Sequence, residues 1–108
     1  MSFDDRYRIL FEPLKIGPVT TPNRFYQVPH CNGMGYRDVS GMVALRAIKA
    51  EGGWGTVCTE QVEIHHTSEI TPFIELRIWD DRDVPILSRI SSAVHEYGSL
   101  AGIELAYN

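Results

Sequence analysis

The stretch FYQVPHCNGMGYRDVSGMVALRAIKAEGGWGTVCTE, residues 25–60, decides the fold. Its first five residues, 25–29, are mainly aromatic and β-branched and predict a short buried strand. Proline has no N–H to donate to a sheet ladder, so we expect this strand to end at Pro29. The glycine-containing run of residues 30–40 predicts a loop, in which backbone can approach a ligand closely.

A helix is predicted after this loop. Apolar residues recur at helical spacing from Met42 to Ile48, on one face of the expected helix. Ser40 is expected to cap its start, and Gly52 is expected to stop it. The next apolar run, residues 54–60, predicts a second short strand.

The same order then repeats. Asp83 is expected to cap a second helix that has Pro85 in its first turn, where a missing N–H costs little. An apolar stripe continues to Tyr97, and Gly98 is expected to end the helix. Residues 100–107 predict a third strand. Ahead of all these elements, two short apolar pieces surround the Gly17-Pro18 pair and predict a small hairpin or an extended entry segment.

Strands that alternate with helices predict an α/β fold with parallel pairing. In parallel α/β folds the chemistry lies at the carboxyl ends of the strands. Those ends are predicted at residues 28–31, 59–61 and 104–107, and each of them carries polar or reactive groups. We therefore expect a functional site at this edge of the sheet.

Composition narrows the classes of function. The 108 residues include 10 Lys and Arg against 14 Asp and Glu, a formal net charge of −4 at pH 7. A nucleic-acid partner needs a basic face, and this mildly acidic chain argues against one. No apolar run approaches the roughly 18–20 residues that span a bilayer. The first residues do not form a secretory signal, so we expect a cytoplasmic location and no membrane partner.

Two cysteines and two carboxylates could carry chemistry. Cys31 follows a strand end, where a thiol can be a nucleophile, a metal ligand, a cofactor anchor or a small buried packing residue. Cys58 lies inside the second strand and is expected in the core. Glu60 and Glu104 end neighbouring strands and could act as acid and base, accept hydrogen bonds from a ligand or bind Arg24. No metal-ligand spacing occurs among the histidines and cysteines, so no metal site is expected.

Six separated motifs allow a family comparison. They are LFEPLKIG (10–17), PNRFYQVPHC (22–31), KAEGGWG (49–55), TE (59–60), RIWD (77–80) and VHEYGSLAG (94–102). In this order they resemble the opening of the flavin-dependent amine dehydrogenases, which act on trimethylamine, dimethylamine or histamine. These enzymes belong to the wider old yellow enzyme family.

The resemblance implies an FMN-binding (β/α)₈ TIM barrel. Residues 1–108 would be its N-terminal portion, the first three β-strands and two helices of a truncated barrel, because a complete barrel needs about 250 residues. The family also carries a 4Fe-4S cluster, which takes about four cysteines and would belong to an absent downstream part. On this interpretation the isolated 108-residue chain is expected to be inactive.

The resemblance also implies residue roles. Cys31 matches the cysteine that bonds through sulfur to C6 of FMN in the amine dehydrogenases. Gln61 matches a substrate-binding position that is tyrosine in the trimethylamine enzyme, where it helps to form an aromatic cage for a cation. The other cofactor-binding matches are Val28, Pro29, His30, Glu60 and Glu104. No catalytic residue is assigned within these 108 positions.

The implied activity is oxidation of a C–N bond in a small amine, with electrons passed to flavin. The implied partners are the amine, an electron-transfer acceptor protein and, at full length, a second copy in a homodimer. Two alternatives stay open. Some ene-reductases, or NAD(P)H:flavin oxidoreductases, also place a cysteine two residues after this proline and bind FMN non-covalently. The chain could instead be a catalytically silent fragment.

Overall fold

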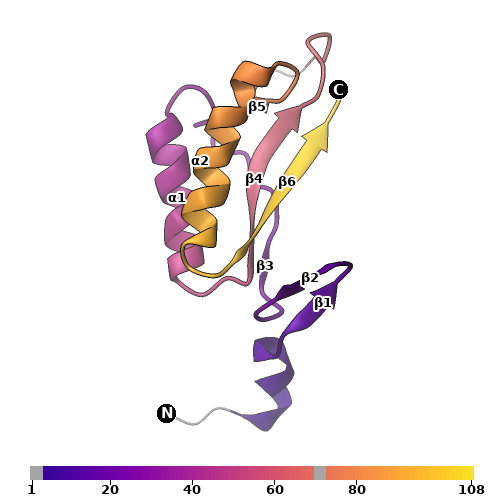
Figure 1. Ribbon diagram of the computed structural model, residues 1–108, viewed down its shortest axis with the longest axis vertical. Helices are drawn as coiled ribbons and strands as arrows, with labels where there is room; N and C mark the ends of the chain where they lie inside the picture. The colour runs from indigo at the N-terminus through magenta and orange to yellow at the C-terminus, as the bar shows by residue number, and fades with distance from the viewer. Residues whose placement is uncertain (1–3, 70–72) are drawn as a thin grey trace.

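The computed structural model describes residues 4–69 and 73–108, and the predicted α/β order is confirmed. Three strands alternate with two helices (Figure 1). These elements are β3 (Tyr26–Gln27), α1 (Val39–Glu51), β4 (Thr56–Glu63), α2 (Val84–His95) and β6 (Leu100–Ala106). All the pairings among these strands are parallel, with β4 between β3 and β6.

A fourth strand, β5 (Leu76–Arg77), was not predicted. It pairs in parallel with the end of β4, where Val62 lies opposite Leu76. A short 3-10 helix, η2 (Asp81–Asp83), then leads into α2. The described part of the segment between β4 and α2 therefore adds a strand to the sheet.

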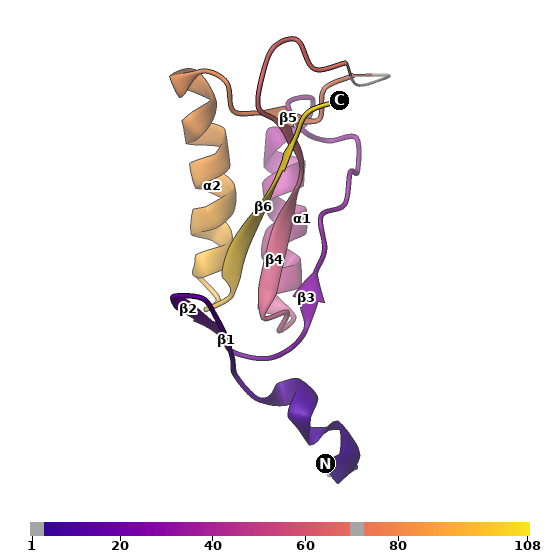
Figure 2. The same cartoon turned by 90° about the vertical axis from the view of Figure 1, so that its right-hand side faces the viewer.

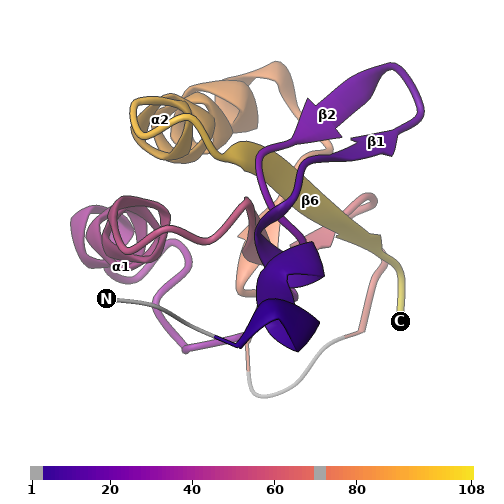
Figure 3. The same ribbon diagram turned by 90° about the horizontal axis from the view of Figure 1, so that it is seen from below.

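Both helices pack on the same face of the sheet, as Figures 2 and 3 show. The buried apolar residues lie between these layers and form one cluster: Met42, Ala50, Val57, Val62, Leu76, Ile90 and Val94. Because each parallel strand contributes to this face, burial of these side chains holds strands and helices together.

A bulge in β4 changes which of its side chains face the helices. Cys58 pairs with Gly102 and Gln61 with Glu104, so two residues of β4 oppose one residue of β6. Side chains alternate along a strand, yet Val57 and Val62, an odd number of positions apart, both lie in the helix-side core. The bulge therefore reverses which side chains at the end of β4 face the helices. The pattern predicted a strand that ends at Glu60, but β4 continues to Glu63 because its last three residues pair with β6 and the final two also with β5.

The N-terminal segment forms the predicted hairpin. The strands β1 (Leu14–Ile16) and β2 (Val19–Thr21) are antiparallel, and Gly17 in the turn has φ +58°. Before the hairpin lies a 3-10 helix, η1 (Asp5–Phe11). Figures 1 and 3 place both below the end of the sheet where β4 and β6 begin. The Thr56 hydroxyl donates to the hydroxyl of Thr21 at 3.3 Å and joins the hairpin to the sheet.

The predicted caps were partly wrong. Asp38, not Ser40, caps α1, because its carboxylate accepts the backbone N–H of Gly41 at 2.9 Å. Asp83 stands at the start of α2 but makes no capping bond there with its side chain. Gly98 follows α2 as predicted, with φ +82°.

The buried face of α1 also differs from the predicted one. Its buried residues are Met42, Arg46 and Ala50, four positions apart, whereas Ile48 is 63% exposed. Ile103 and Leu105 are also exposed, on β6 at one edge of the sheet. No helix within residues 4–69 and 73–108 has the length and apolar character to cross a membrane.

We predict that Met42→Ala lowers the free energy of unfolding by about 2–5 kcal/mol, because it leaves a cavity under β4. Ile48→Ala on the same helix is the control, since it removes an exposed side chain and should cost no more than about 0.5 kcal/mol. Urea unfolding of the purified protein measures both. Equal losses for the two variants would contradict this assignment of the core.

Candidate functional site

A loop of residues 28–36, called here the cysteine loop, follows β3. Its first part is open to solvent: Val28 is 62% exposed, His30 and Cys31 are exposed, and Pro29 is half-buried. Cys31 is a free thiol, and its Sγ accepts the backbone N–H of Gln61 at 3.4 Å. The structure therefore brings the ends of β3 and β4 together, as predicted for neighbouring parallel strands.

The cysteine loop is held on its buried side by Arg46 of α1, whose side chain is fully buried. Its guanidinium donates to the carbonyl oxygen of His30 at 2.5 Å and to Oδ1 of Asn32 at 2.5 Å. It also donates to the carbonyl oxygen of Cys58 in β4 at 2.9 Å. The sequence predicted no role for Arg46. Its spacing of four from both Met42 and Ala50 was the available signal.

Glu60 was predicted beside a cofactor, and its side chain lies completely buried under the cysteine loop. One carboxylate oxygen accepts the backbone N–H of Asn32, and the other accepts that of Gly35, both at 2.9 Å. Burial favours the neutral acid. Hydrogen bonds from Glu75 and from the two N–H groups, with the charge of Arg46, nevertheless lower the pKa of Glu60. The buried carboxylate of Glu60 thus fixes the backbone of the cysteine loop at Asn32 and Gly35.

A second buried carboxyl group, Glu75, lies beside Glu60 and was not predicted. Burial and the Glu60 carboxylate raise the pKa of Glu75 to about 7. The backbone carbonyl of Glu75 accepts the N–H of Tyr36 at 3.1 Å. Glu75 therefore contacts the far end of the cysteine loop and carries a titratable group into the site.

The surroundings of Cys31 are acidic. Burial raises the pKa of the Cys31 thiol, and the charges of Glu75, Glu60 and Glu104 raise it further, while the N–H of Gln61 acts in the opposite direction. Glu104 is half-buried on β6, where its backbone N–H donates to the hydroxyl of Thr59. Of the predicted carboxylates, Glu60 thus lies under the loop, and Glu104 is close enough to act on the thiol electrostatically.

The side chain of Gln61, the predicted substrate-binding residue, is half-buried and held by Glu63. Its amide donates to Oε1 of Glu63 at 2.8 Å. Fully buried Glu63 also accepts the hydroxyl of Ser68 at 2.7 Å and the amide of Asn108 at 3.1 Å. This network fixes the orientation of Gln61 and joins the carboxyl ends of β4 and β6.

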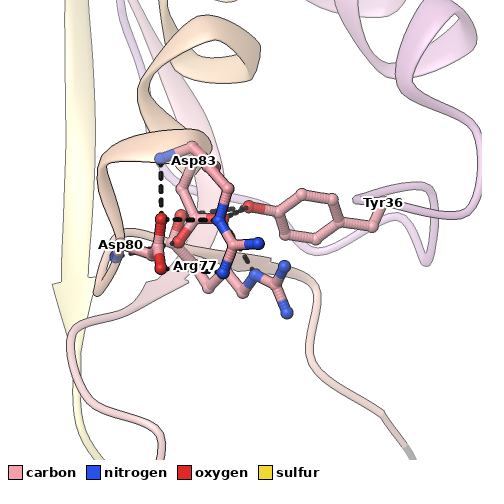
Figure 4. A network of polar contacts seen from close by, with 5 residues as sticks. Tyr36, Arg77, Asp80 and Asp83 are labelled. Carbon is pink, nitrogen blue, oxygen red and sulfur yellow. Dashed lines mark hydrogen bonds and ion pairs between the residues drawn. The ribbon is translucent and has the colours of Figure 1, made fainter.

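A third polar network locks the end of the cysteine loop to β5 and α2 (Figure 4). The hydroxyl of Tyr36 donates to Asp83 at 2.9 Å, and Nε of Arg77 donates to the same oxygen at 2.9 Å. Burial and the Asp83 carboxylate raise the pKa of Tyr36 to about 12. Asp83 also accepts the backbone N–H of Asp80. These bonds explain why Asp83 does not cap α2 with its side chain.

Cys58 is buried, as predicted, and forms no disulfide with Cys31. It lies on the sheet face away from the helices, next to Gly102, where an added Cβ would come within 2.6 Å of its sulfur. A separate apolar groove lies between α2 and β6 and is lined by residues such as Leu87, Ala101 and Ile103. None of the predicted site residues lines this groove.

Comparison with known proteins gives a consistent result. Residues 9–108 match the model of the NADH:flavin oxidoreductase / NADH oxidase family. The chain is 53% identical over 107 residues to dimethylamine dehydrogenase of Hyphomicrobium sp. (strain x), covering 99% of this chain and 14% of that protein.

Two solved structures share the fold closely. Histamine dehydrogenase from Rhizobium sp. 4-9 superposes with a TM-score of 0.92 at 65% identity, over 97% of this chain and 16% of that one. The 6-hydroxypseudooxynicotine amine oxidase of Pseudomonas geniculata N1 gives 0.91 at 52% identity, over 96% and 16%. The chain therefore spans about one-sixth of the length of these relatives.

We predict that Gly35→Ala strongly destabilises the cysteine loop. Gly35 has φ +28°, and an added Cβ would lie 1.6 Å from the carbonyl oxygen of Glu75, so backbone must move. Strain and overpacking together should cost roughly 3 kcal/mol or more in urea unfolding. The control Gly17→Ala, with φ +58° and open space around it, should cost only about 1–2 kcal/mol. A smaller loss for Gly35→Ala than for Gly17→Ala would contradict the prediction.

Proposed function

Because this chain belongs to the NADH:flavin oxidoreductase / NADH oxidase family, we propose that it is part of an FMN-dependent amine dehydrogenase. On this proposal its strands and helices are the first units of a (β/α)₈ barrel. The supporting observation is the exposed Cys31 thiol at the carboxyl ends of parallel strands, where barrel enzymes place their chemistry.

The residues present fit a flavin. Cys31 is exposed and not disulfide-bonded, and it lies at a strand edge with the half-buried carboxylate of Glu104 near it. We propose that Cys31 holds FMN covalently through sulfur. Val28, Pro29, His30 and Glu104 would lie along the cofactor, and Glu60 would support the loop from below. Bound FMN would accept the two electrons released when the carbon next to the amine nitrogen is oxidised.

The chain's own residues position the reaction. Arg46 and Glu60 hold the backbone of residues 30–35, so the thiol is presented on a fixed loop. Gln61, oriented by Glu63, would contact the amine. A glutamine offers a cation no aromatic face, so a primary or secondary amine is favoured over a tertiary one.

We also propose the remaining parts of the system by analogy with the amine dehydrogenases. A 4Fe-4S cluster would be held by a part of the protein outside these residues, and electrons would pass to an acceptor protein. The enzyme would be a cytoplasmic homodimer. Analytical ultracentrifugation of the purified full-length enzyme tests the homodimer, and iron analysis tests the cluster.

The covalent link has a direct test. We expect the full-length wild-type enzyme to give a yellow pellet after acid precipitation, because a thioether keeps flavin on the protein. Cys31→Ala should give a colourless pellet and a yellow supernatant. Cys58→Ala is the matched control and should keep its tethered flavin. A colourless wild-type pellet would contradict covalent attachment.

A second candidate is an ene-reductase with non-covalent FMN, favoured by the family's NADH:flavin chemistry. It predicts that acid releases the flavin from wild type and that NADPH drives reduction of an activated alkene. Oxidation of dimethylamine or histamine without alkene reduction would exclude it.

The role of Gln61 is tested by Gln61→Tyr. An added aromatic face should raise the kcat/KM for trimethylamine relative to dimethylamine by roughly 2–30-fold, the range expected for about 0.5–2 kcal/mol of cation–π attraction. Gln61→Asn also weakens the hydrogen bond to Glu63, because its side chain is shorter, but it adds no ring and should leave the ratio unchanged. If Gln61→Tyr left the ratio of the two kcat/KM values unchanged, the assignment of Gln61 to the substrate site would be wrong.

A further inference from the structure

We propose that the buried carboxyl groups of Glu60 and Glu75 share one proton and that this proton controls the reactivity of the adjacent Cys31 thiol. The inference rests on the proposed flavin site for its biological meaning, because Cys31 would be the attachment point. Its chemistry concerns only the thiol and two carboxyl groups, so it can be tested without FMN.

The three groups come from different parts of the fold and meet at one point. Cys31 lies in the cysteine loop, Glu60 in β4, and Glu75 just before β5. A sulfur or oxygen atom from each lies within 4.8 Å of those of the other two. Glu60 is 0% exposed and Glu75 is 8% exposed, so water screens the two carboxyl groups poorly.

The hydrogen bonds of this cluster are incomplete. Both oxygens of Glu60 accept backbone N–H groups, and the N–H of Gly33 faces the carboxyl group of Glu75. Oε2 of Glu75 is buried and has no hydrogen-bond partner among residues 4–69 and 73–108. A buried carboxylate oxygen without a donor is costly. A proton on Glu75 removes this cost, because the acid can donate to Glu60.

The surrounding charges decide which carboxyl group carries the proton. Arg46 from α1 faces Glu60 and favours its ionised form, as do the two N–H groups. Arg37, which precedes α1, favours ionisation of Glu75 only weakly against burial and the charge of Glu60. Glu60 is therefore the anion, and Glu75 is the acid that loses its proton at about pH 7.

Loss of this proton changes the surroundings of the thiol. Below about pH 7 the pair carries one negative charge, and above it the pair carries two. Cys31 also faces Glu104 from β6 and the more distant positive charge of Arg46. The thiolate is the reactive form of cysteine, and a second negative charge within 5 Å disfavours it. The pair therefore keeps the thiol less reactive in alkaline solution than a neutral neighbour would.

Glu75→Gln separates this effect from a structural one, because the glutamine amide can still donate to Glu60 but cannot ionise. The experiment measures alkylation of Cys31 by iodoacetamide between pH 6 and 9, in the flavin-free fraction of the purified protein. Mass spectrometry of the Cys31 peptide excludes the signal of Cys58. At pH 8.5 we expect alkylation about three- to tenfold faster in Glu75→Gln than in wild type, with the difference vanishing near pH 6.

Asp83→Asn is the matched control, because Asp83 is a buried carboxylate on η2 that does not face the thiol. Its profile should follow wild type. Superimposed profiles of Glu75→Gln and wild type would overturn the proposal, as would an equal acceleration in Asp83→Asn.

A measurement on wild type covers the case in which Glu75→Gln does not fold. Infrared difference spectra should show the C=O band of a protonated buried carboxyl group at pH 6 that disappears by pH 8. Absence of such a band would overturn the proposal. A colourless acid precipitate would instead contradict only the covalent flavin, because the thiol profile and the infrared band are measured without it.

Discussion

The buried guanidinium of Arg46 is the contact on which the site depends. It extends from α1 to the backbone of the cysteine loop and to β4, and it donates to three acceptors in three directions. A lysine offers a single ammonium and could not reach all three in this planar arrangement. A buried charge of this kind is stable only when it is fully hydrogen-bonded and has an opposite charge nearby, and Glu60 supplies that charge. Loop, helix and strand are therefore coupled through one side chain.

The bulge in β4 is the second constraint, because it decides what each face of the sheet carries. Before the bulge Val57 faces the helices, and after it Val62 does, so the apolar layer continues without interruption. The bulge also places Gln61 and Glu63 on the sheet face away from the helices, where their side chains hydrogen-bond to each other. A strand with strict alternation from Val57 would have placed both of these polar residues in the helix-side core.

The sequence predicted the elements better than the contacts between them. Gly98 and Pro29 mark chain reversals and strand ends through local backbone chemistry, so the order of strands and helices could be predicted. The two-residue strand β5 (Leu76–Arg77) could not, because so short a segment has no measurable alternation and depends on pairing with β4. Arg46 and Glu75 were missed because their burial depends on partners far away in the chain. Residue type alone assigns both to the surface.

The helix–sheet core and the cysteine loop are stabilised by different interactions. This difference decides how well each tolerates substitutions. Burial of apolar side chains between the helices and the sheet is non-directional and tolerates exchange of similar residues. The cysteine loop, besides the packing of Met34 and Tyr36 on this core, depends on hydrogen bonds: its backbone is bound by Arg46, Glu60 and the carbonyl of Glu75. Directional bonds fix the position of a thiol more sharply than apolar packing does, but they fail when one partner is lost. The residues that decide the chemistry are thus better found through the acceptors of Arg46 and the donors to Glu60 than through the apolar pattern that decides the fold.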